Sequence, residues 1–168
     1  MPASLLDEAK ALLATCEGRG LTLATAESCT GGLIAATLTA IAGSSAVVTG
    51  GFVTYSNAMK TKMVDVPEAV LAAHGAVSAE VAQAMAEGAL RASGANLALS
   101  CTGIAGPGGA TPAKPVGLVF IACAGLDAAT LVERHMLPGD RAAVREGTVA
   151  AAFALARRAL SQRMPCTR

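Results

Sequence analysis

The chain has almost no aromatic side chains and almost no net charge. It contains no Trp, one Tyr and three Phe, and its formal net charge is +1 at pH 7. A nucleic-acid binder carries a basic face, and a single-strand binder also needs rings on which bases stack. The sequence therefore predicts no nucleic-acid partner. Since 53% of the residues are hydrophobic, the core must be built from Ala and aliphatic side chains.

The cysteine patterns of a disulfide framework or a zinc site are also missing. The five cysteines are an odd number, lie far apart and form no Cys-x-x-Cys pair. This spacing argues against both kinds of site, and we predict neither a metal nor an organic cofactor. Charges interrupt the first apolar run, which argues against a signal peptide, and every apolar stretch is shorter than the ~18 residues of a membrane span. We therefore expect a cytoplasmic protein without membrane contact.

What the chain does contain is a mixture of helix and strand patterns over 168 residues. Helices are predicted at 4–16, 33–41, 79–92 and 141–160, with short ones after residues 56 and 67; strands are predicted at 21–26, 46–55, 95–101, 116–124 and 130–136. Helices and strands mix without strict alternation. The pattern predicts an α/β fold, a three-layer α/β/α sandwich with a mixed sheet.

The stretch 21–32 combines reactive side chains with a place for a ligand. A buried strand ends there in a tight turn that holds Glu27, Ser28, Cys29 and Thr30, and a helix starts after a glycine pair. Open α/β sheets place ligands at such turns, and a helix N-terminus presents free N–H groups. The turn suits a hydroxyl that attacks an electrophile beside a bound anion. It also suits a plain helix cap, which the residues alone favour for Ser28.

A nucleophilic Ser28 needs a base. The chain has two histidines, His74 and His135, and neither has the surroundings of a Ser-His-Asp triad. No Gly-x-Ser-x-Gly elbow is present. The other type of base is a lysine in a desolvated pocket that lowers its pKa. Lys60 and Lys62 follow directly on the second strand, but the sequence favours solvated helix lysines for both.

Two further features of the sequence are ambiguous. The Gly-rich loop 102–109 is able to cradle a phosphate through backbone N–H groups. It lacks the Gly-Lys-Ser/Thr ending of a P-loop, and many such loops are only turns. Cys29 is a rival nucleophile, because the pKa of a thiol falls at a helix N-terminus. Cys101 and Cys123 are predicted to be buried strand residues.

Several motifs, in order and spacing, closely resemble the CinA C-terminal domain family: AESCTGG at 26–32, TYSN at 54–57, HGAVS at 74–78 and TGIAGP at 102–107, with KPVG at 114–117 behind them. The resemblance covers about residues 5–160, the core of what we expect to be one domain, 1–168. The family includes bacterial nicotinamide mononucleotide amidohydrolases. The amino-terminal domain of the longer members has no counterpart in this sequence, so we expect the stand-alone form.

The resemblance implies a serine amidohydrolase of the Ser/Lys type. Its nucleophile falls on Ser28, its lysine on Lys60 and its tyrosine on Tyr55. The implied reaction converts nicotinamide mononucleotide, the small-molecule partner, to nicotinate mononucleotide and ammonia. Two positions depart from the family pattern. Met59 stands where an acidic residue is frequent, which leaves open how Lys60 is held, and Asp65 stands where a glycine is common.

The resemblance also implies roles around this pair. Ser28 would attack the amide after passing its proton to neutral Lys60, directly or through Tyr55. Backbone N–H groups of residues 29–31 are the expected oxyanion donors, and loop 102–106 is the expected phosphate seat, with an arginine supplied across a contact in a homo-oligomer. The predicted substrate-binding residues are Cys29, Thr30, Gly31, Gly32, Asn57, Thr102, Gly103, Gly106, Arg141 and Arg145. An inactive pyridine-nucleotide-binding module of the same fold is the alternative.

Overall fold

The structure is a computed structural model that describes residues 1–125 and 127–162. Strands among these residues form one sheet in the order β2-β1-β3-β4-β5. Their bounds are β1 Leu23–Glu27, β2 Val48–Val53, β3 Leu97–Gly103, β4 Leu118–Gly125 and β5 Ala128–Met136. β1 pairs in parallel with β2 and β3, whereas β3–β4 and β4–β5 are antiparallel. The predicted mixed sheet is confirmed.

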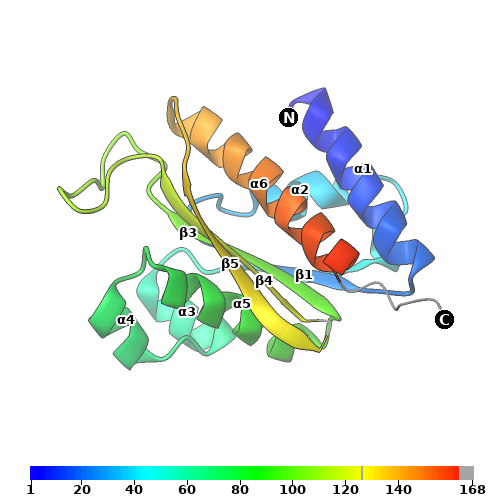
Figure 1. The fold of residues 1–168 in the computed structure, drawn as a ribbon, viewed down its shortest axis with the longest axis horizontal. Coiled ribbons are helices and arrows are strands. Elements are labelled where there is room, and N and C mark those ends of the chain that lie inside the picture. Colours follow the sequence, from blue (N-terminus) through cyan, green and yellow to red (C-terminus); the bar gives the residue numbers. More distant parts are fainter. Residues whose placement is uncertain (126, 163–168) are drawn as a thin grey trace.

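Helices cover both faces of the sheet (Figure 1). On one face lie α1 Ala3–Gly18, α2 Leu33–Thr39 and α6 Arg141–Gln162; on the other lie α3 Asn57–Val64, α4 Glu68–His74 and α5 Ala79–Ser93. A short 3-10 turn, Ser44–Ala46, precedes β2. The three-layer α/β/α sandwich is thus confirmed, and the ends of the elements differ from the predicted ends by two residues or fewer. Within the described part of the chain, no helix has the length and apolar content that crossing a membrane requires.

β1 lies at the centre of the fold, between two parallel neighbours, and all five of its residues are buried. In a strand that is covered on both faces, consecutive residues are all buried. α2 packs from one side, with Ile34 and Leu38 in the larger core cluster, and α5 packs from the other, with Val81 and Met85 in the second cluster. This double cover fixes the position of the turn that follows β1.

The topology places three loops at one edge of the sheet. Because β1, β2 and β3 are parallel, their carboxyl ends meet at the same edge. The chain leaves β1 toward α2 on one face, leaves β2 toward α3 on the opposite face, and leaves β3 into the loop before β4. Ligands bind in open α/β sheets where neighbouring strands send the chain in different directions. The fold therefore predicts a site between the ends of β1, β2 and β3.

α3 and α5 meet backbone to backbone at Gly88. A Cβ at this position would lie 1.7 Å from the carbonyl oxygen of Val64, the last residue of α3. Any other residue would push α3 outward, since neither helix backbone can yield that far. Lys60 lies one turn before Val64 on the same helix, so Gly88 governs how deeply Lys60 reaches into the fold.

Asp65 carries backbone strain that a glycine would relieve. It caps the C-terminus of α3 in the left-handed region, with φ 53° and ψ 33°. We expect Asp65→Gly to raise the free energy of unfolding by about 0.5–1 kcal/mol. Urea unfolding would show a higher midpoint at an unchanged slope. Lys62→Gly, inside the same helix, is the control and is expected to lose about 1 kcal/mol. A lower midpoint for Asp65→Gly would contradict the strain.

Candidate active site

Ser28 follows β1 directly and does not cap α2. Its N–H donates to the carbonyl oxygen of Cys101 at 3.1 Å, and its side chain is 9% exposed. The N–H groups at the start of α2 donate instead to the carboxylate of Glu27, from Ile34 at 2.9 Å and Ala35 at 2.8 Å. The favoured interpretation of Ser28 as a cap is therefore wrong, because a longer side chain one residue earlier takes that role. The hydroxyl of Ser28 is left for other contacts.

Lys60 is buried, and its amine reaches Ser28. Its Nζ lies 3.0 Å from Ser28 Oγ and donates to the carbonyl oxygen of Thr54 at 2.9 Å. The residue is 1% exposed. Burial lowers the pKa of Lys60 from 10.5, while the nearby thiols of Cys29 and Cys101 raise it by a smaller amount. The interpretation of Lys60 as a solvated lysine is wrong. Because its amine is desolvated, the neutral form that can accept a proton is favoured.

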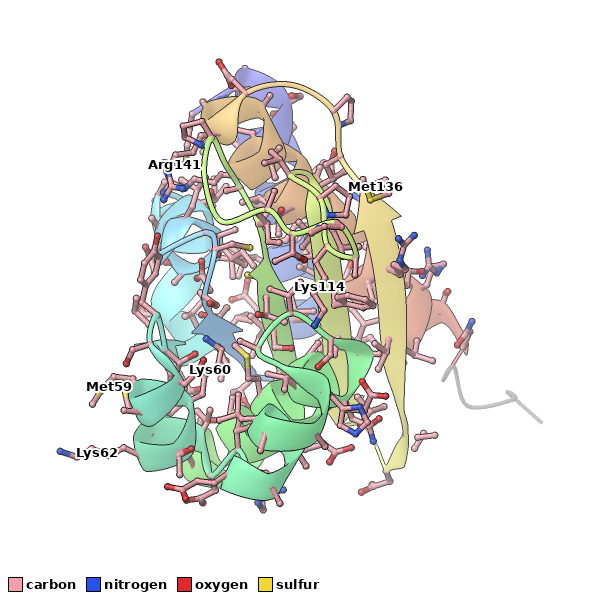
Figure 2. The ribbon with its side chains drawn as sticks, turned by 90° about the vertical axis from the view of Figure 1, so that its left-hand side faces the viewer. Met59, Lys60, Lys62, Lys114, Met136 and Arg141 are labelled. Carbon is pink, nitrogen blue, oxygen red and sulfur yellow. The ribbon has the colours of Figure 1, made fainter. Side chains whose placement is uncertain are left out.

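The neighbours of Lys60 on α3 point the other way. Figure 2 shows Met59 and Lys62 directed outward, whereas Lys60 is directed into the molecule. Ser56 caps the helix by accepting from the N–H of Met59 at 3.2 Å. Residue 59 thus takes no part in holding the amine, and the carbonyl of Thr54 does so instead. An acidic side chain at position 59 is not needed to hold Lys60 in this structure.

Tyr55 and Arg141 form a second pair at the end of β2. Arg141 donates from Nη2 to the hydroxyl of Tyr55 at 3.0 Å and from Nη1 to the carbonyl oxygen of Gly106 at 2.9 Å. Tyr55 is 58% exposed, so it stands at the rim rather than beside the buried amine. Arg141 makes these contacts within its own chain, and the supply of an arginine by a second subunit stays a prediction. Arg145 donates to the carbonyl oxygen of Thr30 at 2.8 Å, again within one chain.

A cavity of about 280 Å³ joins most of the predicted residues. Its lining includes the predicted Ser28, Cys29, Tyr55, Asn57, Lys60, Thr102, Gly103, Gly106 and Arg141. Thr30, Gly31, Gly32 and Arg145 do not line it. Neither of the two histidines lines it either. Three strand ends, α3 and the first residue of α6 therefore converge on one cavity near the lower end of the usual size range for ligand pockets.

The sequence reasoning assigned no role to several groups around this cavity. Its remaining lining residues are Ala76, Val77, Ile104, Ala105, Gly108 and Gly109. Most of them belong to the motifs of the resemblance, and membership in those motifs was the available signal. The loop that carries Val77 is held in place by Thr102, whose hydroxyl donates to the carbonyl oxygen of Ala76 at 2.8 Å. Thr54 and Glu27 also belong to these motifs, but the motifs gave no indication that the carbonyl of Thr54 anchors Lys60 or that the carboxylate of Glu27 caps α2.

Hydrogen bonds within the turn leave fewer backbone N–H groups available to bind an oxyanion. The N–H of Gly31 donates to the carbonyl oxygen of Ser28 at 3.1 Å, and that of Gly32 to Glu27 at 3.1 Å. Within residues 1–125 and 127–162, the N–H groups of Cys29 and Thr30 donate to no backbone carbonyl. These two remain able to meet a developing negative charge beside Ser28.

Cys29 lines the cavity as a thiol with little tendency to ionise. A hydrogen bond with Cys101, burial and the charge of Cys101 raise its pKa well above 9.0, and the negative charge of Glu27 adds a smaller rise. The N–H groups of α2 that would favour a thiolate are already bonded to Glu27. This environment disfavours the alternative in which Cys29 is the nucleophile, because the thiolate is the reactive form.

Potential metal ligands do not cluster in the described part of the chain. No group of three or more His, Cys, Asp or Glu side chains there is placed to hold a metal ion. The absence of a metal or cofactor from the chemistry stays a prediction. Cys16, Cys29, Cys101 and Cys123 are buried, and Cys101 lies in β3 and Cys123 in β4, which confirms both as buried strand residues. Cys166 lies outside the described residues.

Residues 6–160 match the model of the CinA C-terminal domain. Among curated proteins, a CinA-like protein of Mycolicibacterium gilvum is 56% identical over 155 residues, which are 92% of this chain and 36% of that protein. A CinA-like protein of Citrifermentans bemidjiense is 58% identical over 144 residues, which are 86% and 34% of the two chains. The chain therefore spans about a third of the length of these curated relatives.

Solved structures share the whole fold. The competence/damage inducible protein CihA of Agrobacterium tumefaciens superimposes with a TM-score of 0.92 at 45% identity, over 96% of this chain and 98% of that one. A CinA superfamily protein of Klebsiella pneumoniae gives a TM-score of 0.90 at 34% identity, over 94% and 98%. The α/β sandwich found here is thus the fold of those proteins.

Proposed function

The chain belongs to the CinA C-terminal domain family, and we propose that it hydrolyses the carboxamide of nicotinamide mononucleotide to nicotinate mononucleotide and ammonia. One observation carries the proposal: the buried amine of Lys60 lies 3.0 Å from the hydroxyl of Ser28. A hydroxyl becomes a nucleophile when an adjacent base removes its proton, and a desolvated lysine is such a base. The amide bond and the nucleotide come from the family resemblance.

The first half of the reaction forms an acyl-enzyme. Neutral Lys60 accepts the proton of Ser28 while Oγ attacks the amide carbon, and the carbonyl of Thr54 keeps the amine in place. The direct Lys60–Ser28 contact supports transfer without Tyr55 as a relay. The N–H groups of Cys29 and Thr30 receive the developing oxyanion, and such a donor typically contributes about 3 kcal/mol to transition-state stabilisation.

The second half releases both products. The protonated amine of Lys60 gives its proton to the departing ammonia, which leaves Ser28 acylated by the nicotinoyl group. Lys60, neutral again, then takes a proton from water, and the resulting hydroxide attacks the ester carbon. Oγ leaves with the proton from Lys60, and nicotinate mononucleotide departs. The residues that carry these steps are all supplied by one chain.

The phosphate of the substrate needs a seat within reach of this cavity. Arg141 stands at its rim, and within residues 1–125 and 127–162 its guanidinium bonds to uncharged oxygens only, those of Tyr55 and Gly106. A phosphate would exchange these neutral contacts for stronger charge-assisted ones. Gly103 and Gly106 also line the cavity, and the carbonyl of Gly106 is in contact with Arg141. We assign the phosphate to the part of the cavity beside Arg141.

An ammonia-release assay on the purified chain tests the proposal. Steady turnover of nicotinamide mononucleotide, with formation of nicotinate mononucleotide, is the expected result. Free nicotinamide is the control substrate and is expected to react far more slowly, because it lacks the phosphate. Saturable binding of nicotinamide mononucleotide by calorimetry without any product would favour the inactive binding module instead. Neither binding nor turnover would remove nicotinamide mononucleotide as the ligand.

Tyr55 is expected to matter less than the Ser28–Lys60 pair. Its hydroxyl bonds to Arg141 and stands at the exposed rim, so Tyr55→Phe removes a positioning contact and leaves proton transfer intact. We expect a loss in kcat/KM of less than about tenfold, which corresponds to one hydrogen bond of ordinary strength. Steady-state kinetics measure it. A loss that equals that of the Lys60 variant would make Tyr55 the proton relay.

A further inference from the structure

Glu27 is a buried carboxylate that the proposed reaction does not use. It is 1% exposed and lies at the end of β1, directly before Ser28. Its two oxygens accept hydrogen bonds from Thr30 Oγ1 at 2.6 Å, Ala35 N at 2.8 Å, Ile34 N at 2.9 Å, Gly32 N at 3.1 Å and Thr25 Oγ1 at 3.3 Å. Three of these partners are backbone N–H groups, which only donate. The site thus fits the ionised form, an acceptor at both oxygens.

These bonds close the turn that carries the nucleophile. The carboxylate precedes Ser28, whereas its partners Thr30, Gly32 and Ile34 follow it, so the chain between them is drawn into a loop. The main chain of Ser28 is held from the other side by the carbonyl of Cys101. Ser28 Oγ therefore meets Lys60 Nζ on a turn clamped at both ends. A hydrogen-bonded ring of this kind leaves little freedom for the hydroxyl to drift.

The charged and titratable groups around the turn come from four elements, one of which is α6, whose Arg145 donates to the carbonyl oxygen of Thr30. Glu27 lies at the end of β1, Lys60 reaches in from α3, and Cys101 lies on β3 beside Cys29. Thr30 links two of them, because its hydroxyl contacts both Glu27 and Cys101 Sγ, the latter at 3.0 Å. A thiolate at Cys29 would add a second negative charge beside Glu27 in a buried place. Like charges at such a site oppose ionisation.

We propose that Glu27 is the positioning residue of this turn: its carboxylate ties Thr30 and α2 together, which holds Ser28 Oγ at Lys60 Nζ, and its charge keeps Cys29 a thiol. Glu27 thereby selects the hydroxyl over the neighbouring thiol as the nucleophile. The first half of this statement rests on the proposed amidohydrolase function, and the second half does not. Glu27 touches no substrate and acts only through its neighbours.

Two substitutions separate charge from reach. Glu27→Gln keeps the length of the side chain but turns one acceptor oxygen into an NH2 group, which must face a donor. Glu27→Asp keeps the charge but is one methylene too short to bond the same N–H groups. For both, we expect kcat with nicotinamide mononucleotide to fall by at least about tenfold, because small misplacements of reacting groups are costly. KM is expected to stay within about threefold, since neither change reaches the phosphate side.

Alkylation of Cys29 by iodoacetamide gives a readout that does not depend on turnover. The tryptic peptide of residues 20–60 contains Cys29 as its single cysteine, so mass spectrometry follows this thiol alone. Since the thiolate reacts, loss of one neighbouring charge in Glu27→Gln is expected to move the alkylation profile to lower pH and to make the reaction at pH 8 faster than in the wild type. In Glu27→Asp the charge remains, and the profile is expected to keep its wild-type midpoint.

Glu68→Gln is the matched control, because Glu68 is an exposed carboxylate in the first turn of α4. It is expected to change neither readout.

If Glu27→Gln fails to fold, Thr30→Val takes its place, since it removes the 2.6 Å bond with a side chain of the same shape, and kcat should still fall severalfold. A kcat within threefold of wild type in the folded variant overturns the positioning role. An unmoved profile in Glu27→Gln overturns the selection against Cys29. A wild-type chain that releases no ammonia refutes the proposed reaction, while the alkylation result still decides the role of Glu27's charge.

Discussion

Replacement of Ser28 by alanine is expected to lower kcat for ammonia release from nicotinamide mononucleotide by at least about 10³-fold, because no acyl-enzyme forms without the hydroxyl. The fold should be unaffected, since Ser28 holds the turn through its backbone and its side chain does not cap α2. Binding of nicotinamide mononucleotide, measured by calorimetry, is expected to persist. The combination of retained binding and lost turnover assigns the chemical step to this hydroxyl.

Two further variants serve as comparisons for Ser28→Ala, one as a control and one as a test of the rival nucleophile. Ser161→Ala removes an exposed hydroxyl at the end of α6 and is expected to behave as wild type. Cys29→Ala keeps the backbone N–H beside Ser28 and is expected to lose less than about tenfold in kcat. Full activity in Ser28→Ala together with an inactive Cys29→Ala would transfer the nucleophile to the thiol. It would also contradict the raised pKa of Cys29.

Lys60→Met is expected to reduce kcat by about 10²–10⁴-fold, the usual range for loss of a general base. Methionine fills a similar volume without an amine, so Ser28 keeps its proton. In the wild type, kcat/KM is expected to rise with pH through the lowered pKa of Lys60 and then level off, since only the neutral amine accepts a proton. Lys62→Met, two residues away and directed outward (Figure 2), is the control. A loss below about threefold in Lys60→Met would remove Lys60 from the mechanism.

Although Lys60→Met is expected to lower kcat, it is expected to raise the free energy of unfolding. Burial lowers the pKa of Lys60 below its value of 10.5 in the unfolded chain. Between the two values the unfolded chain binds more protons, so wild-type stability rises with pH across that window. Below the window the penalty for burying the amine is present in full. Lys60→Met is therefore expected to be more stable than wild type at acidic and neutral pH, with a difference in urea midpoint that shrinks toward pH 10.5. A difference that grows with pH would contradict the neutral amine.

Local signals in the sequence were sufficient for the elements and their caps. The apolar run of β1, the cap at Ser78 and the cap at Asp140 are features that neighbouring residues determine, and all three are present. The position of Lys60 is not determined in this way. Its burial depends on Gly88, which admits α3 against α5, and its partner Ser28 lies 32 residues earlier. Helix periodicity describes a face of α3 but not what that face meets.

The error at Ser28 has a similar physical origin. Sequence reasoning looks for a cap in the residue just before a helix, and Ser28 is a favoured type. Here the glycine pair adopts positive φ, 59° at Gly31 and 100° at Gly32, which folds the chain back so that Glu27 reaches α2. Likewise, nothing local marks Tyr55 as the partner of Arg141, since the two are 86 residues apart. Such pairings arise from the tertiary fold: the family resemblance implied roles for Ser28, Lys60 and Tyr55, but Arg141 lies in none of its motifs.

Gly88 has a consequence for any mutational survey of this chain. The residue lies outside the cavity and contacts no group that takes part in the proposed chemistry. A single added methyl there would displace α3 and withdraw the amine from the hydroxyl, so the variant would score with the catalytic positions in an activity screen. A map of intolerant positions would then extend to the buried side of α5. Random libraries that aim to change substrate preference should keep this position fixed and vary the rim around Tyr55 and Asn57 instead.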